Sequence, residues 1–448
     1  MAYVVFAVSS EIHIHIYLTR GDNMATFLIC STPVFGHVLP MLAVGKHLAS
    51  RGHRVRMLTG SRFNDIISGA GIEFASLPLP ADYDDRNLHA AFPGAVEKTG
   101  PAGAKAQLRL VFMDPMPHQF VAMEDHIADL SPTAVLVDTM FFGALPLLLK
   151  AGPRPPVLAV GVIPLLQSSR DVAPFGMGLP PVTGLPGRAR NALLSAMNQL
   201  LFRDLQKRAG RLTEELVHQR PPVNWLDWSK LSDGFLQLTV PGFEYPRSDL
   251  PANTTFVGPI LPNSSSEFHE PDWWPELEQR RVVHVSQGTV DNVDLGELIG
   301  PTLNGLAGED LLVVATTGGP PASEIPGPLP TNARVASFIP YDRLLSYVDV
   351  MVTNGGYGGM QFALSYGVPL VVAAGTAGDK PEIAARVAWS GAGVSIKTRK
   401  PTAAAVAAGV RKVLEDPRFA VAAKRLSREM ADYSALDSIT AAAESYVR

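Results

Sequence analysis

The sequence predicts an α/β protein with two doubly wound domains, each built around a mainly parallel sheet, and three observations support this prediction. The chain has 448 residues, more than one hydrophobic core usually supports. Short apolar runs alternate with helical segments, as expected for parallel strands joined by helices. This pattern stops in the Pro-, Ser- and Asn-containing stretch 258–272 and then starts again. We therefore expect domains at 24–257 and 273–430, a linker at 258–272 and a C-terminal helix at 431–448.

The expected strands are apolar runs, many of them rich in β-branched residues. In the N-terminal half they are 27–31, 55–59, 134–138 and 157–160. In the C-terminal half they are 282–286, 311–316, 335–338, 349–353 and 370–373. After the first strand, a loop is expected at 31–40. A helix is then expected from Pro40, because apolar residues recur at helical spacing until Gly52 ends the pattern.

Composition and charge describe an ordinary globular protein with long loops. Hydrophobic residues make up 46% of the chain and charged residues 18%, and it contains 39 glycines and 38 prolines. The net charge of −4 and the lack of a Lys/Arg cluster argue against binding to nucleic acid or to an anionic membrane. The single cysteine, Cys30, excludes an intramolecular disulfide and a Cys-based zinc site, and we expect it to be buried. We expect a cytoplasmic protein without a transmembrane segment.

The first 23 residues differ from the rest of the chain. Their apolar stretch lacks a basic start, is broken by Glu11, His13 and His15, and is too short to span a bilayer, which argues against a signal peptide. Three interpretations remain: an added strand or hairpin, a disordered extension, or translation from a start codon upstream of Met24. We favour the last two, because Met24 leads directly into the first strand. His13 and His15 alternate as in a metal clamp, but this pattern is weak.

The segment 352–380 predicts a cradle for a diphosphate. It reads VTNGGYGGMQFALSYGVPLVVAAGTAGDK, in which an apolar strand runs into glycines that open a helix, and a second strand precedes Asp379. The glycines would let the backbone approach a ligand, and the helix would direct unpaired N–H groups and its positive dipole end at anionic oxygens. These glycines are Gly355, Gly356, Gly358 and Gly359. The alternative is that they serve turn geometry alone, since G-x-G-x-x-G spacing is lacking.

This segment resembles the C-terminal donor-binding signature of the inverting UDP-glycosyltransferase superfamily, which runs T-H-G-G-x-x-S/T, then G-V-P, then D/E-Q. This superfamily includes bacterial glycosyltransferases that act on natural products such as macrolides. The resemblance implies a GT-B fold. In this fold two Rossmann-like domains face each other across a cleft. The resemblance further implies that the N-terminal domain binds the acceptor and the C-terminal domain binds a nucleotide-diphosphate sugar.

Two residues of the N-terminal half match catalytic positions of this family. The stretch 31–40, STPVFGHVLP, is similar to the family's G-H-x-x-P turn, in which the histidine removes a proton from the acceptor. His37 is therefore expected to be the general base, because an imidazole titrates near neutral pH. Asp138 follows a buried strand, as the family's aspartate does, and would fix the histidine tautomer. The alternatives are an exposed loop histidine and an aspartate that only caps a helix.

Three positions depart from the donor signature. Asn354 replaces a histidine that contacts the diphosphate, and Gly359 replaces a serine or threonine. Phe362 replaces a glutamate that bridges both ribose hydroxyls. A deoxyribose has no 2′-hydroxyl to join such a bridge, so the loss of the carboxylate removes a reason to prefer UDP over dTDP. We therefore expect dTDP-sugars to be tolerated.

The resemblance implies further donor contacts. Asp379 would hold sugar hydroxyls, as the first residue of the D/E-Q pair does. Lys380 replaces the glutamine, and it would either contact a phosphate or sugar oxygen or pair with Asp379 or Glu382. The remaining expected donor residues are Gln287, Gly288 and Thr289 near the diphosphate, and Phe338 and Ile339 near the base.

The implied reaction is a single displacement with inversion at the anomeric carbon, without a metal or a cofactor, because helix amides and Thr289 would meet the charge of the leaving diphosphate. A lipophilic or aromatic acceptor, such as a polyketide or a phenol, is expected from the aromatic and methionine residues in 80–120 and 164–190. The expected acceptor contacts are Phe112, Met116, Phe141 and Phe175. Alternatively, these side chains pack under long loops. Two other functions stay open, a nucleotide-sugar epimerase of the same fold and a catalytically silent binding subunit.

Overall fold

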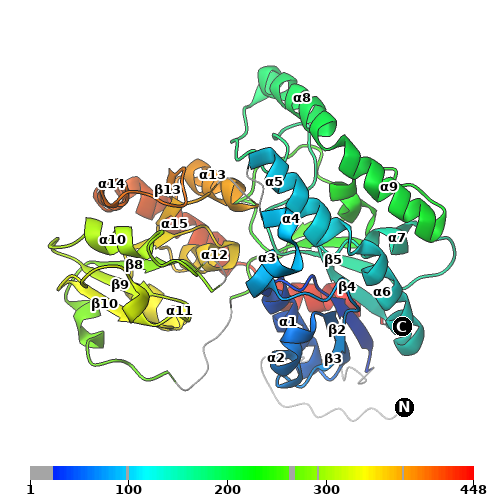
Figure 1. The fold of residues 1–448 in the computed structure, drawn as a ribbon, viewed down its shortest axis with the longest axis horizontal. Helices are drawn as coiled ribbons and strands as arrows, with labels where there is room; N and C mark the ends of the chain where they lie inside the picture. The colour runs from blue at the N-terminus through cyan, green and yellow to red at the C-terminus, as the bar shows by residue number, and fades with distance from the viewer. Residues whose placement is uncertain (1–23, 97–99, 262–267, 290–291, 376–377, 448) are drawn as a thin grey trace, which may run out of the picture.

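The computed structural model describes residues 24–96, 100–261, 268–289, 292–375 and 378–447. The expectations for residues 1–23, and those for the linker at 262–267, lie outside this range. Figure 1 shows two lobes, each with its own sheet. We call the part around the first sheet the N-terminal lobe and the part around the second sheet the C-terminal lobe.

Seven described strands form the first sheet, and all neighbouring pairs are parallel. The strands are β1 (Thr26–Cys30), β2 (Arg54–Thr59), β3 (Glu73–Ser76), β4 (Ala134–Asp138), β5 (Val157–Gly161), β6 (Gly234–Gln237) and β7 (Thr254–Phe256). Their order is β3-β2-β1-β4-β5-β6-β7. The direction of winding therefore changes between β1 and β4, where the loops after the two strands diverge and leave a crevice.

The second sheet repeats this design with six described strands, again in parallel pairs. The strands are β8 (Val282–Ser286), β9 (Leu312–Thr316), β10 (Ala333–Ala336), β11 (Val350–Thr353), β12 (Leu370–Ala373) and β13 (Gly393–Ile396). Their order is β10-β9-β8-β11-β12-β13, so the winding changes between β8 and β11. Two doubly wound parallel sheets confirm the predicted fold class.

Helices cover both faces of each sheet (Figure 1). The reason is visible in β1, where Phe27 and Ile29 join one hydrophobic cluster and Leu28 and Cys30 join another. Successive side chains of a strand point to opposite faces, so an entirely apolar strand must be covered on both sides. The helices of the N-terminal lobe are α1 (Phe35–Ser50), α2 (Asn64–Ser68), α3 (Leu88–Ala91), α4 (Pro93–Val96), α5 (Gly100–Gln107), α6 (Met116–Leu130), α7 (Ala144–Leu149), α8 (Gly184–Leu201) and α9 (Arg203–Val217).

The second half of the chain contributes seven α-helices to the described residues. They are α10 (Ile299–Gly305), α11 (Tyr341–Leu344), α12 (Tyr357–Ser365), α13 (Lys380–Ser390), α14 (Ala403–Glu415), α15 (Pro417–Ala431) and α16 (Ala435–Glu444). A π-helical segment lies at Leu108–Met113, and 3-10 segments lie at Ser61–Phe63, Asp85–Asn87, Trp225–Leu231, Trp274–Glu278, Ala322–Glu324 and Leu345–Tyr347.

The last helix, α16, returns to the N-terminal lobe (Figure 1). Ile439 packs into the same cluster as Val38 of α1. At its end, Glu444 accepts a hydrogen bond from Nε of Arg51 at 2.9 Å, and its Oε1 lies 3.0 Å from a ring nitrogen of His53. The chain therefore crosses between the lobes twice. Within the described residues, no helix is long and apolar enough to cross a membrane.

All nine expected strands are present within two residues of their predicted ends. The sequence analysis missed β3, β6, β7 and β13, which are short and lie at or next to a sheet edge. The expectation of a loop up to Pro40 was wrong, because α1 already begins at Phe35 and contains Pro40. Proline is most common in the first turn of a helix, so its position suggested a later start.

Candidate active site

The carboxyl ends of the strands at the two switch points carry the expected site residues. His37 follows β1 and Asp138 ends β4, and these two strands pair with each other. Gln287 and Asn354 follow β8 and β11, which also pair. Open α/β sheets bind ligands outside the strand ends at such points. Each sheet therefore presents its candidate residues where a ligand is expected.

His37 and Asp138 form a buried pair. His37 lies in the first turn of α1 instead of the expected loop, and its Nδ1 is 2.9 Å from Oδ1 of Asp138. The carboxylate of Asp138 also accepts backbone N–H groups from Thr32 at 2.5 Å and from Met140 at 2.8 Å. Since both carboxylate oxygens already act as acceptors, Nδ1 of His37 donates, and the free lone pair lies on Nε2.

The side chains of this pair are almost completely shielded from solvent. Asp138 is fully buried and His37 is 8% exposed. Burial raises the pKa of the Cys30 thiol well above its ordinary value, and the charge of Asp138 raises it further. The same two causes, with Asp85 added, raise the pKa of the Tyr83 phenol. Cys30 is buried as expected, and its protonated thiol is a core group and not a nucleophile.

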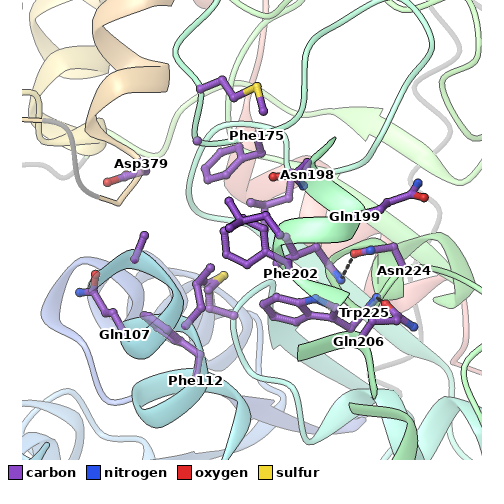
Figure 2. A pocket seen from close by; sticks show the side chains of 18 of the residues that line it. Gln107, Phe112, Phe175, Asn198, Gln199, Phe202, Gln206, Asn224, Trp225 and Asp379 are labelled. Carbon is purple, nitrogen blue, oxygen red and sulfur yellow. Dashed lines mark hydrogen bonds between the residues drawn. The ribbon is translucent and has the colours of Figure 1, made fainter. Parts of the chain in front are cut away.

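A cavity of about 1240 Å³ opens beside His37. Its lining is mainly apolar with a set of amide side chains, and the close-up in Figure 2 shows the larger of these side chains. Asp379 reaches it from the C-terminal lobe, across from Phe202 and Trp225 (Figure 2). The labelled amide residues are Gln107, Asn198, Gln199, Gln206 and Asn224. His37 and Asp379 thus border one space, although they follow strands of different sheets.

The cavity divides the expected acceptor residues into two pairs. Phe112 and Phe175 line it, and the ring of Phe112 lies 6.5 Å from that of His37. Met116 and Phe141 do not line it, because both are fully buried in the hydrophobic core between the first sheet and its helices. Their side chains stabilise the lobe by packing. The sequence offered no way to separate these two roles, since aromatic and methionine side chains suit both an apolar cavity and a core.

The glycines after β11 expose backbone groups. Gly355 has a φ of +86°, a conformation that favours glycine, and Gly356 caps the N-terminus of α12. Among the described residues, no heavy atom lies within 4 Å of a Cβ built on Gly356 or Gly358. A Cβ on Gly359 would meet the ring of Tyr341 at 3.5 Å. The backbone at the start of α12 therefore has open space beside Gly356 and Gly358, where an anion could approach a helix N-terminus.

Two amide side chains connect the loops of this region. Nδ2 of Asn354 donates to the backbone oxygen of Gln287 at 2.6 Å. The side chain of Gln287 is 2% exposed and accepts the N–H groups of Leu298 and Ile299, both at 3.1 Å. Nζ of Lys380 donates to the backbone oxygen of Asn354 at 3.4 Å. In this structure the side chains of Asn354 and Gln287 therefore connect the loops after β8 and β11.

The remaining donor positions differ in exposure. Phe338 is 69% exposed, whereas Ile339 is 1% exposed, so the side chain of Ile339 is a core group. Phe362 is 5% exposed and packs against Tyr341 and Tyr366, which makes it a core residue. Thr289 is exposed. The preceding residue, Gly288, has a φ of +73°.

Sequence reasoning missed two parts of the site. The first is the wall formed by α5, α8 and α9, whose amide side chains carry no motif. The second is a buried group of charges at Glu244, Glu382 and Arg386. A signal for the second part was present, because Glu382 and Arg386 are four residues apart on the helix that begins beside Asp379.

Comparison with known proteins identifies the family. The model of the C-terminal domain of erythromycin biosynthesis protein CIII-like proteins matches residues 302–441, and the glycosyltransferase family 28 N-terminal domain matches residues 35–125. The 4′-demethylrebeccamycin synthase of Lentzea aerocolonigenes is 41% identical, covering 94% of this chain and 98% of that protein. UDP-glycosyltransferase 2 of Phaeomoniella chlamydospora is 36% identical, covering 92% and 93%.

Solved structures agree on the fold. The glycotransferase of kitacinnamycin superimposes with a TM-score of 0.71 at 22% identity, covering 94% of this chain and 99% of that one. The glycosyltransferase VinC, solved in complex with dTDP, superimposes with a TM-score of 0.65 at 19% identity, covering 94% and 99%. The predicted GT-B arrangement is thereby confirmed.

Proposed function

The chain belongs to the UDP-glycosyltransferase superfamily of GT-B enzymes, and from this premise we propose that it transfers a sugar from a UDP- or dTDP-sugar to a hydroxyl of a lipophilic or aromatic natural product, with inversion. The observation that carries this proposal is that His37 and Asp379 border the same cavity. A base from one lobe and a candidate sugar ligand from the other are thus placed on one space. This is the arrangement that direct transfer between two bound substrates needs.

His37 is proposed to act as the general base. The acceptor hydroxyl attacks the anomeric carbon and gives its proton to Nε2 of His37, while the bond from that carbon to the diphosphate breaks and its electron pair leaves with the nucleotide. Asp138 stabilises the resulting imidazolium, because its carboxylate is held 2.9 Å from Nδ1 by two backbone N–H groups. Attack from the face opposite the leaving group inverts the anomeric configuration.

The leaving diphosphate is proposed to lie at the N-terminus of α12. The open space beside Gly356 and Gly358 lets anionic oxygens approach backbone N–H groups. These groups are fixed before the reaction, so they stabilise the developing charge without reorganisation. The proposal includes no metal ion and no other cofactor. Thr289, in the loop after β8, and Lys380, the first residue of α13, are further candidates for phosphate contacts.

The donor site is proposed to accept both nucleotides. Phe362 occupies the position of the ribose-binding glutamate and packs into the core, so this position offers the ribose no carboxylate. A site without this contact has less reason to discriminate against a deoxyribose. Phe338, with 69% of its surface exposed, is the candidate platform for the base.

The acceptor is proposed to be a large, largely apolar molecule with several polar groups. Ligand cavities usually have volumes of about 300–1,000 Å³, and this cavity of about 1240 Å³ exceeds that range. Its aromatic walls suit a polycyclic or macrocyclic scaffold. Its amide side chains would contact polar substituents and orient the reacting hydroxyl toward His37.

A binding screen followed by a turnover assay tests the proposal. Thermal shifts with UDP, dTDP and GDP should show stabilisation by the first two, and strict dependence on UDP would contradict dual donor use. Donor turnover is then measured with and without a phenolic acceptor, for the wild type and for His37→Ala. Conversion of the donor to an epimer without acceptor would favour an epimerase. Nucleotide binding without turnover of any tested donor would favour a silent subunit.

A further inference from the structure

A loop of the N-terminal lobe is docked onto the helix of the C-terminal lobe that begins beside Asp379. Phe175 and Met177 on this loop line the cavity. The backbone N–H groups of Gly176 and Gly178 both donate to Oε1 of Glu382 in α13, at 2.9 and 2.8 Å. One carboxylate oxygen of the C-terminal lobe therefore holds a wall of the cavity.

The same carboxylate belongs to a buried chain of charges. Oε2 of Glu382 accepts from Nη1 of Arg386 at 2.6 Å. Arg386 in turn donates from Nε and Nη2 to Oε1 of Glu244, with Nε at 2.7 Å. The other oxygen of Glu244 accepts the backbone N–H of Leu165 at 3.1 Å, next to Leu166 in the cavity wall. Two separate stretches of the wall are thus connected to α13.

The three charged side chains of this cluster are almost completely buried. Arg386 and Glu244 are 1% exposed and Glu382 is 4% exposed. Burial disfavours the charged form of Arg386, but the two carboxylates outweigh this effect and hold the pKa of Arg386 above its ordinary value. The guanidinium also lies 4.2 Å from the ring centroid of Tyr245. Buried ion pairs are poor sources of net stability but are sensitive to geometry, so they suit a positioning role.

We propose that Glu382 is a positioning residue that fixes the Phe175–Met177 wall of the acceptor cavity relative to Asp379, so that the acceptor and the donor sugar are held in register across the two lobes. This inference rests on the proposed function, because it assigns the wall to the acceptor and Asp379 to the donor sugar. Glu382 acts through the loop and not on the reacting atoms. The interlobe contact is therefore part of substrate alignment.

The close fit of the loop supports this proposal. Gly178 has a φ of +59°, and a Cβ on it would lie 2.8 Å from the backbone oxygen of Pro381, directly before Glu382. The loop can therefore approach α13 only with glycine at this position. A side chain at position 178 would displace the Phe175–Met177 wall and leave the ion pair between Glu244 and Arg386 intact.

The first test removes the charge of Glu382. Glu382→Gln keeps the size of the side chain, but its single carbonyl oxygen cannot serve both the loop and Arg386. We expect the KM for the acceptor to rise about tenfold, while the KM for the donor changes by less than about twofold. A merely structural role would lower the fraction of active enzyme and leave both KM values unchanged. Glu309→Gln, which removes the partner of Arg411 on the C-terminal lobe, is the matched control.

The second test displaces the loop from its other side and leaves the ion pairs intact. Gly178→Ala should raise the KM for the acceptor by a similar factor. Gly152→Ala is the control, because Gly152 has a φ of +97° with open space around its Cβ among the described residues, so it strains the backbone outside the cavity lining. The KM for the acceptor of the double variant Glu382→Gln/Gly178→Ala should not exceed the larger KM of the two single variants, because both substitutions break the same contact between the loop and α13. A combined effect equal to the product of the two would overturn the proposal.

A third measurement does not require turnover. Hydrogen exchange of the Gly176 and Gly178 amides should accelerate about tenfold in Glu382→Gln, because the one neutral carbonyl oxygen of glutamine is a weaker acceptor than the carboxylate and is shared with Arg386. Unchanged exchange, or unchanged acceptor KM in both single variants, would overturn the positioning role. If the wild type transfers no sugar, the proposed function fails, and the exchange result alone still decides whether Glu382 holds the loop.

Discussion

The two lobes prepare their halves of the site by different means. In the N-terminal lobe the chemistry depends on side chains, since His37 is oriented by Asp138, which is itself held by two backbone N–H groups. In the C-terminal lobe the candidate anion site is made of backbone, since Gly356 and Gly358 expose the first turn of α12. A side-chain site fails when one residue changes. A backbone site tolerates substitutions that keep the loop conformation.

This difference explains which departures from the family signature the chain carries. In the backbone-built lobe Gly359 lacks the hydroxyl of the signature, and Asn354 carries a neutral amide in place of the histidine. In the structure this amide donates to the backbone oxygen of Gln287 and so connects the two loops. His37 and Asp138, in the side-chain-built lobe, match the family motif. Mutations in the N-terminal lobe are therefore expected to lower the rate of transfer, and mutations in the C-terminal lobe are expected to weaken donor binding.

The largest expected effect is that of His37→Ala. Removing a positioned general base should lower kcat by about 10²–10⁴-fold. Binding of UDP or dTDP, measured by thermal shift, should stay unchanged because the nucleotide is proposed to lie on the other lobe. A variant that retains more than about a third of wild-type kcat would show that His37 is not the base.

A second effect concerns the stability of the C-terminal lobe in acid. His284 is fully buried, with Nε2 3.0 Å from the hydroxyl of Thr316, and burial lowers the pKa of His284 to about 3. Below about pH 6.5 the unfolded chain binds a proton that the folded protein excludes, so stability falls as the pH falls. Between pH 6.5 and 5 this amounts to about 2 kcal/mol.

Denaturant unfolding of the wild type and of His284→Gln at these two pH values measures this effect. The variant should lose less stability on acidification, by about the same 2 kcal/mol. His89→Gln, at an exposed position, serves as the control. Parallel pH profiles for the wild type and His284→Gln would show that His284 is already charged in the folded state.

A smaller effect is expected when a methyl group is added to the backbone-built site. Gly358→Ala should leave the melting temperature unchanged or raise it slightly, because alanine favours a helix by about 0.5–1 kcal/mol over glycine. The methyl group would fill the space proposed for the diphosphate, so the KM for the donor should rise about tenfold. Gly210→Ala, which places a methyl group on α9 in ordinary contact with Cδ of Arg220 at 4.0 Å, is the control. Equal donor KM values for both variants would place the diphosphate elsewhere.

The smallest expected effect is that of a chelator. Within the described ranges, no group of three or more His, Cys, Asp or Glu residues is arranged to hold a metal ion. The proposed mechanism stabilises the diphosphate with backbone N–H groups, so excess EDTA should change the rate by less than about twofold. A rate that falls further and returns with Mg²⁺ would show that a metal ion takes part.

Much of this architecture was predictable from the sequence, for a physical reason. The central strands are buried on both faces and are therefore continuous apolar runs, as in Val135–Val137 and Val350–Val352. The edge strand β3 was missed because it is partly exposed and carries Glu73. The helical position of His37 was missed because Pro40 suggested a later helix start.

Prediction of the site from the sequence was limited by a different factor, the packing of residues distant in sequence. His37, Asp138 and the glycines lie next to strand ends, where local sequence predicts position well. Whether Phe112 or Met116 faces the cavity depends on the packing of helices distant in sequence, and no local pattern records it. The interlobe contacts of Glu382 join residues about 200 positions apart, and only the folded chain brings them together.

The central claim is that a nucleotide diphosphate binds at the start of α12, facing His37 across the cavity. A crystal structure of the complex with UDP or dTDP tests it most directly. Phosphate oxygens are expected within about 3.2 Å of backbone N–H groups in the turn from Gly356 to Gly359, with the terminal phosphate directed toward the cavity. A nucleotide bound at another place, or one whose terminal phosphate points away from His37, would contradict it.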